Sequence, residues 1–295
     1  MKQIITSLLA LALLGWAVPA GARWKVISET AVSGFGHPES VGFDPQAQVL
    51  YVSRFGPELK ALLKDAKGFI SRVDLKGQIL EERSLPGPGV VLHKPKGVWV
   101  AGPRLWTTDI DAAWVFDLKT KKGHKVPLPG ARFANDPVVS AGRLFVSDMG
   151  TGTIYVVEPA DFITTTPHVS TMVQRPGLFP NGLWVNDKGE LLLGTAPRNG
   201  PPGRIYKVTG PSRIEAISPE LGRIDGLAVL SDGTILYTDW AGKGLFALGK
   251  DGTSHLLAAG FSGPADFAVV PRADRYLVVV PDLVEGDLRI FVLEQ

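Results

Sequence analysis

The sequence predicts an all-β protein, a six-bladed β-propeller with four antiparallel strands in each blade. Three observations lead to this prediction. A short phrase recurs six times along the chain, each phrase is followed by a turn and further strands, and the last unit lacks one strand. Repeated units of about four short strands are typical of propellers, and no segment shows a long helical apolar period. A β-solenoid or a β-sandwich is the alternative.

The recurring phrase begins with a polar residue, continues with a small residue or proline, and ends in apolar residues. Its leading residues are spaced by 57, 40, 45, 44 and 41 positions: Glu39, Lys96, Asp136, Asn181, Asp225 and Asp266. Apolar and β-branched residues bounded by Gly, Asp and Pro turns indicate short antiparallel strands. Six units of this length account for the chain beyond residue 22.

The two ends of the repeat array predict how the ring closes. The last unit ends after its third strand, Leu288 to Leu293, and the early run Trp24 to Ser28 has no partner of its own. We therefore expect this N-terminal strand to close the last blade. The first unit is the longest, and its additional residues, Arg54 to Lys67, could form a helical turn or a lid above the scaffold, since such loops often carry function. A tolerated insertion is the other interpretation.

Residues 1–22 have the features of a signal peptide. A positive start at Lys2 precedes the apolar run Ile4 to Val18, which is followed by the cleavage-site pattern Ala20-Gly21-Ala22. We expect residues 23–295 to form a single domain, located in the periplasm or secreted. The chain contains no cysteine, so neither disulfides nor thiolate metal sites are available to it.

Charge and hydropathy exclude several classes of partner. The 31 basic and 29 acidic residues nearly balance, and no basic tract is interleaved with aromatic residues, which argues against nucleic acid. Nothing after the signal peptide is apolar over enough residues to predict a membrane span. We expect a monomer that acts on a small molecule.

The leading polar residues predict a site at one end of the central channel. The innermost strands of a propeller all start around that end, so carboxylates and amides from every blade should gather there. Crowded carboxylates repel one another unless something neutralises them. The oxygen ligands of Glu39, Asn135, Asn181 and Asp225 suit calcium, and less exclusively magnesium, manganese or zinc. A water-filled channel, in which Lys96 satisfies the acids, is equally compatible with the composition.

Four segments, in order and at blade spacing, resemble the SMP-30/gluconolactonase/LRE-like family, which is itself similar to the six-bladed calcium-dependent phosphotriesterases and paraoxonases. They are Pro38 to Asp44, Arg132 to Pro137, Pro180 to Leu183, and Ile224 to Leu227. The resemblance implies that the corresponding Glu39, Asn135, Asn181 and Asp225 hold a catalytic divalent metal. Two departures are Ser40-Val41 in place of the family's usual Gly-Pro, and Lys96, which enters the ring of polar residues.

The resemblance implies an exported, divalent-metal-dependent hydrolase of a small lactone or ester, with a sugar lactone as the favoured substrate class. The metal would polarise the carbonyl and lower the pKa of a water molecule. Asp225 is the first candidate for general base, and Asp266 is the alternative. Lys96 or Arg132 would stabilise the oxyanion or hold a substrate hydroxyl.

Two other functions remain open from the sequence. A non-catalytic propeller could bind a small ligand or a protein partner across the channel face, because a fold alone does not fix a function. A quinone-dependent sugar dehydrogenase would need a channel histidine and clustered arginines, whereas only His37 and His93 lie near phrase starts. A serine hydrolase is not indicated, since no G-x-S-x-G motif occurs.

Overall fold

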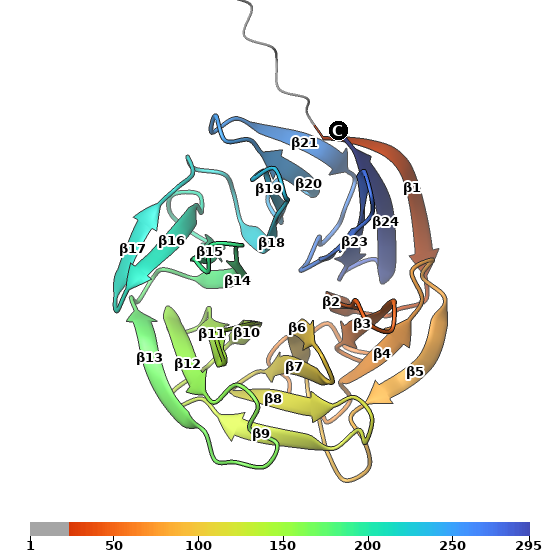
Figure 1. Ribbon diagram of the computed structural model, residues 1–295, viewed down its shortest axis with the longest axis vertical. Coiled ribbons are helices and arrows are strands. Elements are labelled where there is room, and N and C mark those ends of the chain that lie inside the picture. The colour runs from red at the N-terminus through yellow and green to blue at the C-terminus, as the bar shows by residue number, and fades with distance from the viewer. Residues whose placement is uncertain (1–23) are drawn as a thin grey trace, which may run out of the picture.

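The computed structural model describes residues 24–295, and the predicted signal peptide, residues 1–22, lies outside the described residues. The described chain forms 24 strands and no helix, arranged as six antiparallel sheets of four strands each. Figure 1 shows the six sheets placed around a common axis. This arrangement confirms the predicted six-bladed β-propeller. None of the described residues belongs to a helix that could span a membrane.

Five blades follow the chain from the innermost strand outward. Blade one contains β2 (Pro38–Asp44), β3 (Val49–Arg54), β4 (Phe69–Val73) and β5 (Ile79–Leu85). Blade two contains β6 (Pro95–Ala101), β7 (Arg104–Asp109), β8 (Ala112–Asp117) and β9 (Gly123–Pro127). Blade three contains β10 (Ala134–Ser140), β11 (Arg143–Asp148), β12 (Thr153–Glu158) and β13 (His168–Gln174). Blade four contains β14 (Pro180–Val185), β15 (Leu191–Thr195), β16 (Ile205–Gly210) and β17 (Arg213–Ala216). Blade five contains β18 (Ile224–Val229), β19 (Ile235–Asp239), β20 (Gly244–Leu248) and β21 (Ser254–Ala259).

The sixth blade joins the two ends of the described chain. It contains β22 (Ala268–Pro271), β23 (Arg275–Asp282), β24 (Asp287–Glu294) and, as its outermost strand, β1 (Lys25–Ser33). In Figure 1, β1 lies along β24, and the two strands pair antiparallel from Lys25 opposite Glu294 to Ser33 opposite Asp287. The predicted closure of the last blade by the N-terminal strand is therefore confirmed.

Apolar side chains fill the space between neighbouring blades. Where the ring closes, Val41 and Leu50 of blade one pack in one cluster with Val270 and Val279 of blade six. The alternation of side chains across each strand places such residues on both faces of a sheet. Burial of this apolar surface, worth about 25 cal/mol per Å², holds neighbouring blades against each other.

A repeated cap fixes the loop ahead of the inner strand in five of the six blades. In four blades an aspartate ends the second strand and accepts backbone N–H groups from the loop that leads into the inner strand: Asp109, Asp148, Asp239 and Asp282. Asp148, for example, accepts from Arg132 at 3.0 Å and from Phe133 at 2.7 Å. In blade one the guanidinium of Arg54 instead donates to the carbonyl of Phe35 at 2.6 Å. Each cap therefore positions the residues that enter the channel next.

Candidate functional site

A cavity of about 310 Å³ at one end of the channel contains all four predicted metal ligands, Glu39, Asn135, Asn181 and Asp225. Each is the second residue of an inner strand, in β2, β10, β14 and β18 respectively. All four side chains are buried. The recurring phrase therefore brings equivalent positions of four blades to one place, which we call the mouth cavity.

Three oxygens of this set are buried without any hydrogen-bond donor: Oε2 of Glu39, Oδ1 of Asn181 and Oδ1 of Asp225. A buried acceptor without a partner costs about 1–3 kcal/mol, so three in one cavity call for a ligand. Carboxylate and amide oxygens are the donors that calcium and similar hard cations prefer. Within residues 24–295 no three His, Asp or Glu side chains are grouped so that they could hold a metal by themselves, so the fit depends on the two asparagine amides.

Burial also shifts the acid–base properties of the two carboxylates. It raises the pKa of Glu39 well above its usual range, and the nearby charge of Asp225 raises it further. Burial and the charge of Asp266 together raise the pKa of Asp225 to about 7. The indole Nε1 of Trp240 donates to Oδ2 of Asp225 at 2.5 Å, which opposes this rise and fixes the carboxylate orientation. A bound cation would favour the ionised form of both groups.

Asp136 and Asp266 lie elsewhere along the channel. Both line a second cavity of about 300 Å³, which is formed by later residues of the inner strands, such as Phe43 and Trp184. Oδ2 of Asp266 accepts from the Ser40 hydroxyl at 2.5 Å, and Oδ2 of Asp136 accepts from the backbone N–H of Leu183 at 2.6 Å. Asp266, the alternative general base in the sequence prediction, is therefore not in the mouth cavity with Asp225.

Lys96 and Arg132, predicted to contact the substrate, do not line the mouth cavity either. Lys96 is fully buried, and its ammonium lies 4.8 Å from the ring centroid of Phe133 and donates to the carbonyl of Lys94 at 3.2 Å. Burial lowers the pKa of Lys96 to about 8, although the charge of Glu39 opposes this. Among the described carboxylates none forms a direct ion pair with Lys96, although the charge of Lys96 opposes the rise in the pKa of Glu39. Arg132 is exposed.

Sequence reasoning missed the wall of the mouth cavity. In five blades the residue that directly follows the second strand lines it: Phe55, Met149, Ala196, Trp240 and Leu283. Arg198 and Arg223 also line it. Because the first five residues hold the same place in their blades, an alignment of the six second strands would have identified them. His37 and His93 are absent from the lining, so the channel histidine of a dehydrogenase is not found there.

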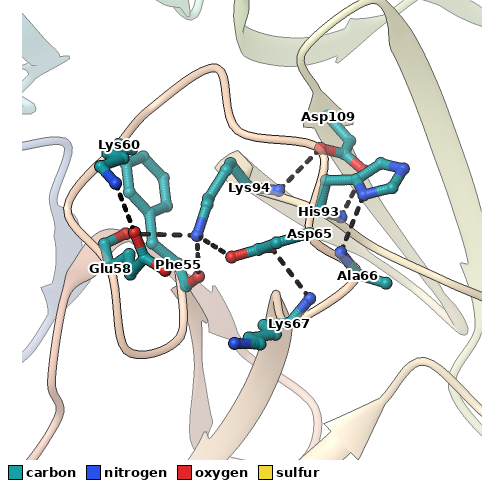
Figure 2. Close-up of polar contacts among 9 residues, drawn as sticks. All are labelled: Phe55, Glu58, Lys60, Asp65, Ala66, Lys67, His93, Lys94 and Asp109. Carbon is teal, nitrogen blue, oxygen red and sulfur yellow. Dashed lines mark hydrogen bonds and ion pairs between the residues drawn. The ribbon is translucent and has the colours of Figure 1, made fainter.

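The long loop of blade one, residues 55–68, forms another part of the wall through Leu59 and Ala61. It contains turns but no helix, so the helical turn that the sequence allowed as one alternative does not form. Figure 2 shows that the fully buried ammonium of Lys94 binds two carbonyl groups of this loop. It donates to the carbonyl of Phe55 at 2.7 Å and to that of Glu58 at 3.2 Å, and it pairs with the Asp65 carboxylate at 2.9 Å.

Lys94→Met should release this loop and destabilise the protein by about 3–5 kcal/mol, because Asp65 and two carbonyl groups would lose their partner. Urea unfolding measures the loss, and limited proteolysis should show new cleavage within residues 55–68. Lys60→Met is the matched control, since Lys60 belongs to the same loop but pairs with Glu58 at the surface. Equal stability of the two variants would contradict the role assigned to Lys94.

Comparison with known proteins places this chain by its fold. No family model and no curated protein matches the sequence. A putative gluconolactonase structure is 16% identical, with a TM-score of 0.64 over 94% of this chain and 93% of that one. A gluconolactonase from Xanthomonas campestris is 15% identical, with a TM-score of 0.63 over 91% of both chains. Virginiamycin B lyase from Staphylococcus aureus, solved with quinupristin, is 13% identical, with a TM-score of 0.61 over 92% of this chain and 100% of that one.

The fold and the comparisons define a six-bladed β-propeller that is similar in fold to the gluconolactonase structures. At these identities the likeness concerns the fold. The resemblance to the SMP-30/gluconolactonase family is accordingly supported at the level of the fold.

Proposed function

We propose that the chain is an exported, divalent-metal-dependent hydrolase of a small lactone or ester. The observation that carries this proposal is the set of three buried, unpartnered oxygens from Glu39, Asn181 and Asp225 in one accessible cavity. The fold shared with two gluconolactonases supports the reaction class. Export is proposed from the signal-peptide pattern of residues 1–22.

Glu39, Asn135, Asn181 and Asp225 would hold the cation, and calcium fits their oxygen donors best. When bound, such a cation supplies Lewis acidity for polarising a substrate carbonyl. The amide oxygens add ligands without adding charge. Lys96, buried behind the cavity, partly balances Glu39 electrostatically and so limits the repulsion among the channel carboxylates.

Asp225 is the general base that we propose. The Trp240 indole holds its Oδ2 and fixes the orientation of the carboxylate, so Oδ1 faces the cavity at the edge of the proposed ligand set, where an attacking water would lie. Asp266, in the other cavity and bonded to Ser40, has no such access to the substrate.

Calcium added to metal-stripped protein should raise the melting temperature by roughly 5–10 °C at a hundredfold excess over its dissociation constant. Asn181→Ala should abolish this shift, because it removes one of the unpartnered oxygens. Asn199→Ala, at an exposed loop position, is the matched control and should keep it. No shift with calcium, manganese or zinc would contradict the proposal and leave the non-catalytic binding propeller as the alternative. A lactone and ester screen of the metal-loaded protein then tests hydrolysis itself.

A further inference from the structure

Two arginines in the wall of the mouth cavity form no direct ion pair with a described carboxylate, although the charge of Arg223 opposes the rise in the pKa of Asp225. Arg223 is partly buried and lies two positions before Asp225, and Arg198 is exposed just after β15. Among the described residues, neither guanidinium takes part in an ion pair, and that of Arg223 lies beside the Trp240 ring. The proposed hydrolysis, as derived from the four ligands and the base, uses neither side chain.

Arg223 is held in place by its surroundings. Its backbone N–H donates to the capping Asp239 at 2.7 Å, and its guanidinium lies 5.8 Å from the Trp240 ring centroid. Trp240 in turn is bonded to Asp225. Yet Nε of Arg223 is buried and has no acceptor. A planar guanidinium that is oriented but unsatisfied matches the geometry of a ligand carboxylate, which can accept two parallel N–H groups.

The charge of the cavity favours the same ligand. The lining contains two carboxylates, Glu39 and Asp225, and two guanidiniums, Arg198 and Arg223, so its formal charges cancel. A bound divalent cation would therefore give the cavity a net charge of +2. Apart from the amides of Asn135 and Asn181, the rest of the wall is largely apolar, including Phe55 and Leu59 from the long loop. Few hydrogen-bonding side chains remain there for the several hydroxyl groups of a sugar ring.

We propose that the site takes an ester or lactone with an apolar body and a carboxylate group, and that Arg223 binds this carboxylate while Arg198 adds attraction at the rim. This inference rests on the proposed function and changes its substrate class from a sugar lactone to an acid-bearing, largely apolar one. Arg223 would orient the substrate through a group remote from the reacting carbonyl.

The test uses the mature protein in calcium and two product-like probes, 4-hydroxybenzoate and its methyl ester, which differ in the carboxylate charge. Isothermal titration calorimetry measures their binding, and chromatography of the mixture afterwards checks that the methyl ester is intact. We expect 4-hydroxybenzoate to bind, and Arg223→Met to weaken it about tenfold to a hundredfold, the usual effect of a lost charge-assisted hydrogen bond. Arg223→Lys should retain part of the affinity. Arg143→Met is the matched control, because Arg143 also lies over an aromatic ring, Phe145, but outside the mouth cavity.

The inference is wrong if neither probe binds, if the methyl ester binds as tightly as the acid, or if both Arg223 variants bind the acid like the wild type. Hydrolysis of 4-acetoxybenzoate and of its methyl ester separates this outcome from failure of the proposed function. Arg223-dependent binding without hydrolysis of either ester would overturn the hydrolase and keep the carboxylate site. If both esters were hydrolysed equally and the Arg223 variants hydrolysed them like the wild type, the hydrolase would be supported and the carboxylate site would be wrong.

Discussion

Asp225→Asn should lower kcat/KM for ester or lactone hydrolysis by about a thousandfold, since it removes both the proposed general base and one anionic metal ligand. The same change should raise the melting temperature of the metal-free protein at pH 8. Without a cation, the Asp225 carboxylate is buried beside other acids, and an amide of the same shape carries no charge to bury.

The opposite signs of these two effects distinguish a functional carboxylate from a structural one. A steady-state assay and a thermal melt on the same preparation measure them together. Asp274→Asn is the control, because the Asp274 side chain is exposed and lies 3.7 Å from that of Arg275. If Asp225→Asn lost stability in the metal-free state, or kept full activity, both the base assignment and the electrostatic description of the cavity would be contradicted.

The metal-free protein should lose stability as pH rises from about 4 to about 7. In the folded state burial raises the pKa of Asp225 to about 7 and that of Asp266 to about 6, from ordinary values near 3.8. Between those values the folded state holds more protons than the unfolded state, so the free energy of unfolding falls as pH increases. Asp225 alone contributes a loss on the order of 4 kcal/mol at 1.36 kcal/mol per pKa unit.

Calcium should reverse this dependence. The ion binds ionised carboxylates, so the rise in melting temperature on adding calcium should be larger at pH 8 than at pH 5. Thermal melts with calcium and with a chelator across this range measure the difference. A metal-free protein that became more stable between pH 4 and pH 7 would show that the channel carboxylates are not the groups that dominate its titration.

The sequence repeat alone predicts most of the fold and part of the candidate site. Strand content, blade number and ring closure follow from apolar runs and turns, which are local. The four predicted ligands reach one cavity because they hold the same position in four equivalent strands. The position of Asp136 shows the limit of that reasoning: Asn135 lines the mouth cavity, whereas Asp136, the next residue of the same strand, lines the second cavity.

Side-chain contacts between segments that are distant in the chain could not be predicted from the sequence. Lys94 and Lys96 look alike in a phrase that reads Lys-Pro-Lys, yet one ties down a loop 29 to 39 residues earlier and the other lies beside Phe133. Arg223 and Trp240 were missed because their importance depends on Asp225, which lies between them in the chain. Only the packing of one blade's loops brings the three side chains together.

The closure of the ring also decides how the molecule would respond to mechanical force. Lys25 and Glu294 form the first rung of the β1–β24 pair, so tension applied at the two ends of the described chain pulls on one rung at a time. Antiparallel strands loaded in this direction unzip, and each hydrogen-bonded pair resists separately rather than all together. After the last rung, Ser33 with Asp287, the load passes into the segment that leads to Glu39. The β1–β24 pairing, which separates at low force, therefore ends a few residues before Glu39, a proposed metal ligand. An ion bound to Glu39 would resist further extension once these two strands have separated.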